Sequence, residues 1–157
     1  MPGTCLSSRS VKATTMLYLT RRETFNAAHK LHVEEWSDAE NLARFGKCSN
    51  PNWHGHNYQL FVTVVGEPDP VTGFVMDAKL LSNIMKAEVV DQVDHRNFNV
   101  DVEWMPKNLQ PTTENIIRTF WGRLEDKINA HGAKLYAIKL VETENIYAEY
   151  FGPEGRK

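Results

Sequence analysis

One stretch of the sequence carries both a strand pattern and the main chemistry, and it reads His54-Gly55-His56-Asn57-Tyr58-Gln59-Leu60-Phe61-Val62-Thr63-Val64-Val65-Gly66. Its alternating side chains predict a strand over residues 57–66 that is apolar on both faces for much of its length. In an extended chain, side chains two residues apart share a face, so His54 and His56 can bind one metal ion. Gly55 lets another backbone segment approach closely. The alternative is a pair of surface histidines near a hairpin.

A thiol and a third histidine lie upstream of this stretch. Cys48 precedes His54 with five intervening residues, and His29 lies on another strand-like segment. Three neutral imidazoles leave the fourth tetrahedral position open for water or substrate, as in catalytic zinc sites. We therefore expect zinc bound by His29, His54 and His56, with Cys48 as a nucleophile or base. A closed structural site with Cys48 as the fourth ligand is the alternative. His32 would face away from His29 in an extended chain, so it is left out.

Composition and charge narrow the class of protein. The chain has 157 residues, 41% hydrophobic and 24% charged, which fits one domain with one core. A net charge of -2 without a basic run argues against a nucleic-acid-binding platform. No apolar stretch approaches the length needed to cross a bilayer. Two cysteines do not make a disulfide framework, and a free Cys48 suggests a reducing compartment, so we expect a cytoplasmic protein.

Residues 1–15 differ from the rest of the chain. They are polar, lack acids and have no apolar core of a secretory signal, and they match a transit peptide only weakly. We expect a flexible N-terminal arm before a single catalytic domain over residues 16–157. An upstream start codon before a start at Met16 is the alternative, and Cys5 is then a bystander.

The first half of the chain predicts two strands and a short helix. Alternation from Met16 predicts a strand that ends near His29. Ser37 and Glu40 have the spacing of a capping box, and a glycine suited to a helix stop follows at position 46, so we expect a helix over residues 38–45. Its expected apolar contacts are Leu42 and Phe45.

The second half predicts two long helices and two strands. After a breaker-rich turn and a brief strand over residues 74–76, an amphipathic helix runs from the N-cap Asp77 to about Val93. A loop over residues 100–111 precedes a second helix, capped by one of two threonines at 112 and 113. The last two strands are expected over residues 135–141 and 146–151.

The order β, short α, β, α, α, β, β indicates an α+β domain. Such an order favours an antiparallel sheet with two long helices on one face. The other face of the sheet carries enough apolar side chains to need a partner, so we expect a homo-oligomer. Nothing in the sequence indicates a linker or an internal repeat that would split the chain.

Further titratable groups could join the metal site. Asp94 and His95 lie at a helix end, where a carboxylate can orient an imidazole and raise its basicity, although a helix-terminal salt bridge is the alternative. Glu142 ends an edge hairpin and could be an ordinary turn acid, and Glu114 opens a helix. A nearby imidazolium or metal lowers the pKa of a cysteine, so the Cys48 thiolate could act as a base. With zinc holding an oxygen, this set suits proton abstraction next to a carbinol carbon.

A series of short motifs runs in a fixed order from about Leu19 to Gly152. They are Phe25-x-Ala27-Ala28-His29-x-Leu31, Asn41-Leu42, Phe45-Gly46-Lys47-Cys48, His54-Gly55-His56-Asn57-Tyr58, Asp69-Pro70-x-Thr72-Gly73, Asp94-His95-x-Asn97, Thr112-Thr113-Glu114-Asn115 and Glu142-Thr143. In these motifs and their order, the chain resembles the 6-pyruvoyl-tetrahydropterin synthase family.

The resemblance implies a tunnelling fold (T-fold), with a four-stranded antiparallel sheet and two long helices on one face. Three subunits would form a barrel, and two trimers would stack into a hexamer. It also implies a zinc-dependent lyase that converts 7,8-dihydroneopterin triphosphate to 6-pyruvoyl-tetrahydropterin. That reaction eliminates triphosphate and moves hydrogens between the side chain and the pterin ring without an external redox cofactor.

The resemblance also implies a role for each site residue. The zinc ligands would be His29, His54 and His56. The catalytic groups would be Cys48, which takes the proton, and the assisting pair Asp94 and His95, supplied by a neighbouring subunit. The substrate-binding residues would be Glu142, which accepts two hydrogen bonds from the guanidine-like edge of the pterin, and the nearby Thr113 and Glu114.

Two alternatives to this function stay open. The family includes bacterial 6-carboxy-tetrahydropterin synthases, which use the same substrate in queuosine and other deazapurine synthesis. Their spacing from the cysteine to His-Gly-His is shorter than the one here, which favours the pyruvoyl-forming branch. Trp53 departs from the small residue of close relatives and could reshape the mouth of the site. The second alternative is a non-catalytic, zinc-stabilised assembly protein with Cys48 on the metal.

Overall fold

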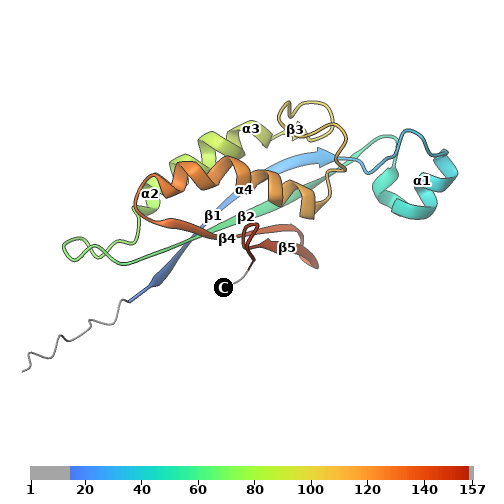
Figure 1. Cartoon of the computed structure of the whole chain (residues 1–157). Coiled ribbons are helices and arrows are strands. Elements are labelled where there is room, and N and C mark those ends of the chain that lie inside the picture. Colours follow the sequence, from blue (N-terminus) through green and yellow to red (C-terminus); the bar gives the residue numbers. More distant parts are fainter. Residues whose placement is uncertain (1–14, 156–157) are drawn as a thin grey trace, which may run out of the picture.

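The structure is a computed structural model that describes residues 15–155. In this part of the chain one sheet has the strand order β3-β1-β2-β4-β5, and the helices α2, α3 and α4 lie together over one of its faces (Figure 1). The elements are β1 (Leu17–His29), α1 (Asp38–Phe45), the 3-10 turn η1 (Gly46–Ser49), β2 (His54–Gly66), α2 (Ala78–Met85), the π-helical turn η2 (Lys86–Val90), α3 (Asp91–Val93), β3 (Arg96–Asn97), α4 (Thr113–Asn129), β4 (Lys134–Thr143) and β5 (Ile146–Tyr150).

The predicted α+β class is confirmed, and the sheet has one strand more than expected. β1, β2, β4 and β5 pair antiparallel, whereas β3 pairs in parallel with residues 27–28 at the outer edge of β1. β3 forms because the backbone N–H groups of His95 and Phe98 donate to the carbonyl oxygens of Asn26 and Ala28, at 2.6 and 2.9 Å. The loop after α3 is thereby attached to the strand that carries His29.

β1 and β2 form a long antiparallel ribbon whose register places the histidines. Its end pairs His29 with His54 and Ala27 with His56, and residues directly opposite each other share a face. β2 starts at His54, three residues before the predicted start, so the His-Gly-His motif is part of the strand. His54 and His56 therefore lie on one face of the strand, as predicted.

The core lies between the sheet and the helices. Alternate β2 residues Leu60, Val62 and Val64 are fully buried in one apolar core with the stripe of α4 that includes Ile116 and Phe120. The predicted helix from Asp77 to Val93 is confirmed as one helical run in which α2 and α3 are joined by η2. The predicted brief strand over residues 74–76 is wrong, because the chain there makes a bend and pairs with no strand in the described residues.

α1 projects from the end of the sheet, beyond the histidine end of β1 (Figure 1). Its predicted limits are confirmed: the Ser37 hydroxyl accepts from the Glu40 N–H at 3.2 Å, and Gly46 ends the helix with a φ of 55°. Phe45 stacks on Trp36 at 5.9 Å between ring centroids. The expected packing of Leu42 is wrong, since 62% of its surface is exposed and α1 stands clear of the core.

The described residues contain no helix that is both long and apolar enough to span a membrane. The predicted N-terminal arm, including Cys5, lies outside the described residues except for Thr15.

Candidate metal centre and active site

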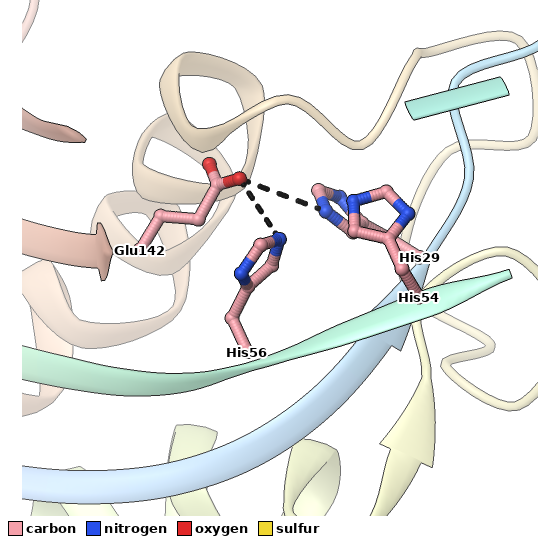
Figure 2. Close-up of side chains that lie close together, drawn as sticks. All are labelled: His29, His54, His56 and Glu142. Carbon is pink, nitrogen blue, oxygen red and sulfur yellow. Dashed lines mark ion pairs between the residues drawn. The ribbon is translucent and has the colours of Figure 1, made fainter. Parts of the chain in front are cut away.

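Three histidines converge at the end of the β1–β2 ribbon. His29 comes from β1, and His54 and His56 come from β2 (Figure 2). Their ring centroids are 4.5 Å apart for His29 and His54, 5.1 Å for His29 and His56, and 5.0 Å for His54 and His56. His29 is buried and the other two are half-buried. The predicted grouping is therefore realised in a single chain.

The carboxylate of Glu142 joins this cluster from the end of β4 (Figure 2). Its Oε1 lies 3.0 Å from His56 Nε2 and 3.8 Å from His29 Nε2. The Thr113 hydroxyl, at the start of α4, donates to the other oxygen, Oε2. One ligand atom from each of His29, His54, His56 and Glu142 lies within 4.8 Å of the other three. We name these four residues the imidazole–carboxylate cluster.

The nitrogen atoms of the cluster suit a divalent cation. His29 Nε2, His54 Nδ1 and His56 Nε2 are buried, and none has a hydrogen-bond partner among the described residues. Buried polar atoms without partners are rare in folded proteins, and a shared metal ion would satisfy all three. Burial is also the main cause that lowers the pKa of each of these histidines below its usual value. They are therefore neutral near pH 7, which is the form that binds a metal.

Cys48 lies beside the cluster but is not one of its four members. It sits half-buried in η1, and its carbonyl oxygen accepts from the Leu31 N–H at 2.9 Å. Burial, followed by the charge of Glu142, raises the pKa of the Cys48 thiol. We expected a nearby cation to lower this pKa, but the imidazoles of the cluster are neutral, and the charge that does shift it, that of Glu142, is negative. A thiol outside the convergent set argues against the closed site with Cys48 as fourth ligand.

Asp94 and His95 are not members of the cluster and lie at the outer edge of β1, although His95 and His56 line the same open cavity. Asp94 Oδ1 accepts from the Asn26 N–H at 2.8 Å, and Oδ2 lies 2.9 Å from His95 Nδ1. The Asn26 hydrogen bond is the main cause that lowers the pKa of Asp94. The His95 side chain is 80% exposed and its backbone has a φ of 58°. The predicted carboxylate–imidazole pair is therefore present, but it faces the outside of this chain next to an open cavity of about 340 Å³.

The other predicted substrate-binding residues divide between the site and the surface. Thr113 is buried against Glu142, whereas Glu114, the next residue of α4, is exposed. From the sequence, Glu142 is either a group that could join the metal site or an ordinary turn acid, and the structure places its carboxylate among the histidines. No spacing along the sequence relates Glu142 to the histidines, because only the pairing of β2 with β4 brings them together.

Together, the antiparallel sheet, the covering helices and the imidazole–carboxylate cluster define a T-fold enzyme. The sequence model described as 6-pyruvoyl tetrahydropterin synthase matches residues 18–153. The chain therefore belongs to the 6-pyruvoyl tetrahydropterin synthase family, a family of lyases.

Individual relatives agree with this placement. The chain is 44% identical over 134 residues to the 6-pyruvoyl tetrahydrobiopterin synthase of Pongo abelii. The matched stretch covers 85% of this chain and 90% of the relative. It is 40% identical over 136 residues to the Drosophila melanogaster protein of the same name. That match covers 87% of this chain and 80% of the relative. The solved structure of Caenorhabditis elegans 6-pyruvoyl tetrahydropterin synthase matches with a TM-score of 0.76 at 38% identity, covering 88% of this chain and 97% of that one.

Proposed function

We propose that this chain is a zinc-dependent lyase that converts 7,8-dihydroneopterin triphosphate to 6-pyruvoyl-tetrahydropterin, eliminating triphosphate and transferring hydrogen internally. The observation that carries the proposal is the convergence, next to Glu142, of three buried imidazole nitrogens that make no hydrogen bond within the described residues. The relatives at 44% and 40% identity are 6-pyruvoyl tetrahydrobiopterin synthases, which supports a reaction of the pterin class.

The proposed zinc ligands are His29, His54 and His56. When bound, zinc would polarise the side-chain hydroxyls of the substrate and hold them in position. The role of the chain is to present three neutral imidazoles in fixed orientations. The His29 ring is fixed because its Nδ1 lies 2.7 Å from the Pro111 carbonyl oxygen, which orients Nε2 toward the cluster.

In this proposal Cys48 removes a proton from the carbon that bears a held hydroxyl. The thiol has a raised pKa in the isolated chain, so it needs a positive charge nearby to become a thiolate near pH 7. A cation held by the three imidazoles would supply that charge without binding the sulfur. The half-buried position of Cys48, beside the cluster and outside its ligand set, supports a base more than a ligand.

Glu142 is the proposed anchor for the guanidine-like edge of the pterin, since a carboxylate can accept two parallel hydrogen bonds there. Thr113 holds one of its oxygens, and the exposed Glu114 is proposed to lie at the mouth of the pocket. Asp94 and His95 are proposed to assist proton transfer in the site of a neighbouring subunit. Their exposure at the outer edge of β1, outside the convergent group, supports this.

The proposed assembly is a homo-oligomer, a hexamer built from two barrel-forming trimers. Exposed apolar residues on the outer strands, Leu17, Tyr18, Ile146 and Tyr147, support a partner surface. The pterin triphosphate is the small-molecule partner. We further propose a cytoplasmic location, which suits a free Cys48.

Product identification tests the reaction. Zinc-loaded protein is incubated with 7,8-dihydroneopterin triphosphate, and the products are identified by mass, with Cys48→Ala as the control. We expect 6-pyruvoyl-tetrahydropterin and triphosphate from the parent protein. A 6-carboxy product with release of acetaldehyde would instead assign the chain to the 6-carboxy-tetrahydropterin synthases. Unchanged substrate with parent and control alike would support the zinc-stabilised assembly protein.

A further inference from the structure

Tyr58 carries a buried hydroxyl that the proposed chemistry does not use. The residue has no exposed surface, and its hydroxyl has no hydrogen-bond partner among the described residues. A buried hydroxyl without a partner destabilises the folded state, whereas phenylalanine would fill the same space without that cost. A tyrosine here therefore calls for a role that appears only when the site is filled.

The ring of Tyr58 lies at the base of the imidazole–carboxylate cluster. It follows His56 by two residues on β2 and shares its face. Its centroid is 5.6 Å from the His56 ring and 6.3 Å from the His29 ring, and it stacks on Phe25 at 5.0 Å. The Tyr58 ring is therefore packed in a fixed position next to the cluster.

Strand register directs Tyr58 toward Glu142. Gln59 pairs with Val141 in the antiparallel β2–β4 ladder, and continuing that register by one residue places Tyr58 opposite Glu142. A phenol keeps its proton near pH 7, so toward a carboxylate it can only donate.

Glu142 must change partners when the cluster holds a cation. In the present arrangement its Oε1 lies 3.0 Å from His56 Nε2, while Oε2 accepts from Thr113. An imidazole nitrogen that binds a metal has no proton to donate, so Oε1 loses this interaction. A carboxylate turned toward a pterin then needs a new donor from the protein, and each of its oxygens can accept more than one hydrogen bond.

We propose that Tyr58 is a positioning residue that donates a hydrogen bond to Glu142 once the carboxylate has left the histidines. This rests on the proposed role of Glu142 as the pterin anchor. The hydroxyl aligns the carboxylate for the pterin edge and takes no part in proton transfer. Tyr58 therefore contributes to the affinity for pterin compounds and leaves the rate of the chemical step to other groups.

The test compares Tyr58→Phe with Trp121→Phe in the zinc-loaded, assembled protein. Trp121 Nε1 is a second buried donor that has no hydrogen-bond partner within residues 15–155, and it lies on α4 beside Gly152, outside the cluster. For Tyr58→Phe we expect KM for the triphosphate substrate and Kd for neopterin, measured by fluorescence, to rise about tenfold, with kcat within about threefold. Zinc affinity, from chelator competition, should not fall, and the melting temperature should hold or rise. For Trp121→Phe, both pterin constants should keep the parent values.

Two results would overturn the inference. One is an unchanged KM and Kd in Tyr58→Phe together with a raised melting temperature, which would make the hydroxyl a purely structural defect. The other is weaker zinc binding, which would place Tyr58 in support of the ligands instead of Glu142.

Glu142→Gln separates this inference from the proposed function. If Glu142→Gln leaves KM and Kd unchanged, the anchor role fails and the inference fails with it. If Glu142→Gln raises both and Tyr58→Phe does not, only the role of Tyr58 is wrong. If both single variants raise them, the double variant should bind pterin little worse than Glu142→Gln alone, because the two residues act through one interaction.

Discussion

Nδ1 of His29 lies 2.7 Å from the carbonyl oxygen of Pro111, and both residues are buried. A carbonyl oxygen can only accept, so this contact assigns the imidazole proton to Nδ1 and leaves Nε2 as the basic nitrogen. The residue that ends the loop before α4 therefore sets the tautomer of a histidine on β1. Such outer contacts orient metal ligands and strengthen binding.

Removing a ligand should abolish tight zinc binding. For His29→Ala we expect the zinc affinity to fall by more than about 100-fold, since the effect of a lost ligand should exceed that of a lost outer contact. Competition with a chromophoric chelator measures this affinity. His131→Ala is the matched control, because His131 is exposed after α4 and lies outside the cluster. An affinity within about threefold of the parent value would remove His29 from the site.

The stability of the metal-free protein should depend on pH through the same histidines. Burial lowers their pKa values in the folded state, whereas the unfolded chain binds protons near the ordinary value of 6.5. Below that value the unfolded state holds more protons, so the free energy of unfolding should decrease as pH falls, by on the order of 1 kcal/mol or more between pH 7 and 5.5. Urea denaturation measures this at each pH. A variant with all three histidines changed to Gln should show a flatter dependence, and an equal slope would contradict the assignment.

Gly55 should be needed for the packing of the two strands. A Cβ at this position would lie 3.1 Å from the backbone oxygen of Ala27 on the paired strand. Gly55→Ala should therefore destabilise the protein by about 1–3 kcal/mol and weaken zinc binding, because the strain falls between His54 and His56. The control is Gly122→Ala on the exposed side of α4, where a Cβ meets nothing within 4 Å. This change should raise the free energy of unfolding by about 0.5–1 kcal/mol, because alanine favours a helix more than glycine does. Thermal unfolding measures the stability of both variants and metal titration measures their zinc affinity. A Gly55→Ala protein as stable as the parent would contradict the close packing of the two strands.

Cys48→Ala should separate catalysis from assembly. Since the sulfur lies outside the convergent ligand set, we expect zinc content and oligomeric state to stay the same. Turnover should fall by at least about 100-fold, the usual contribution of a general base. Metal analysis, light scattering and the product assay report the three quantities. Retained turnover would exclude the thiolate from the mechanism, and lost zinc would return Cys48 to the ligand set.

Mixing two inactive variants should test whether Asp94 and His95 serve a neighbouring subunit. Cys48→Ala and His95→Ala proteins are unfolded together, mixed and refolded. If each site takes its thiol from one chain and its imidazole from another, about a quarter of the sites in a random mixture should be intact. Activity in the mixture but not in either refolded variant alone is the expected result. An inactive mixture with normal assembly would mean that both groups act within one chain.

Local sequence determined the limits of the helices α1 and α4 and the shared direction of His54 and His56. Ser37 and Gly46 mark the ends of α1, and Thr112 caps α4 with its hydroxyl accepting from the Asn115 N–H. These helix ends can be predicted from the sequence because N-caps and C-caps depend on contacts between residues a few positions apart. The shared direction of His54 and His56 follows from the two-residue period of a strand in the same way.

Tertiary structure alone decided which distant groups meet. Strand pairing brings His29 opposite His54 and carries Glu142 to the same end of the sheet, although no spacing along the chain relates these positions. The same packing leaves Cys48 beside the ligand set and turns His95 outward at the edge of β1. Registers of this kind depend on the burial of whole strand faces by α2 and α4, which is a property of the folded chain and of no single segment.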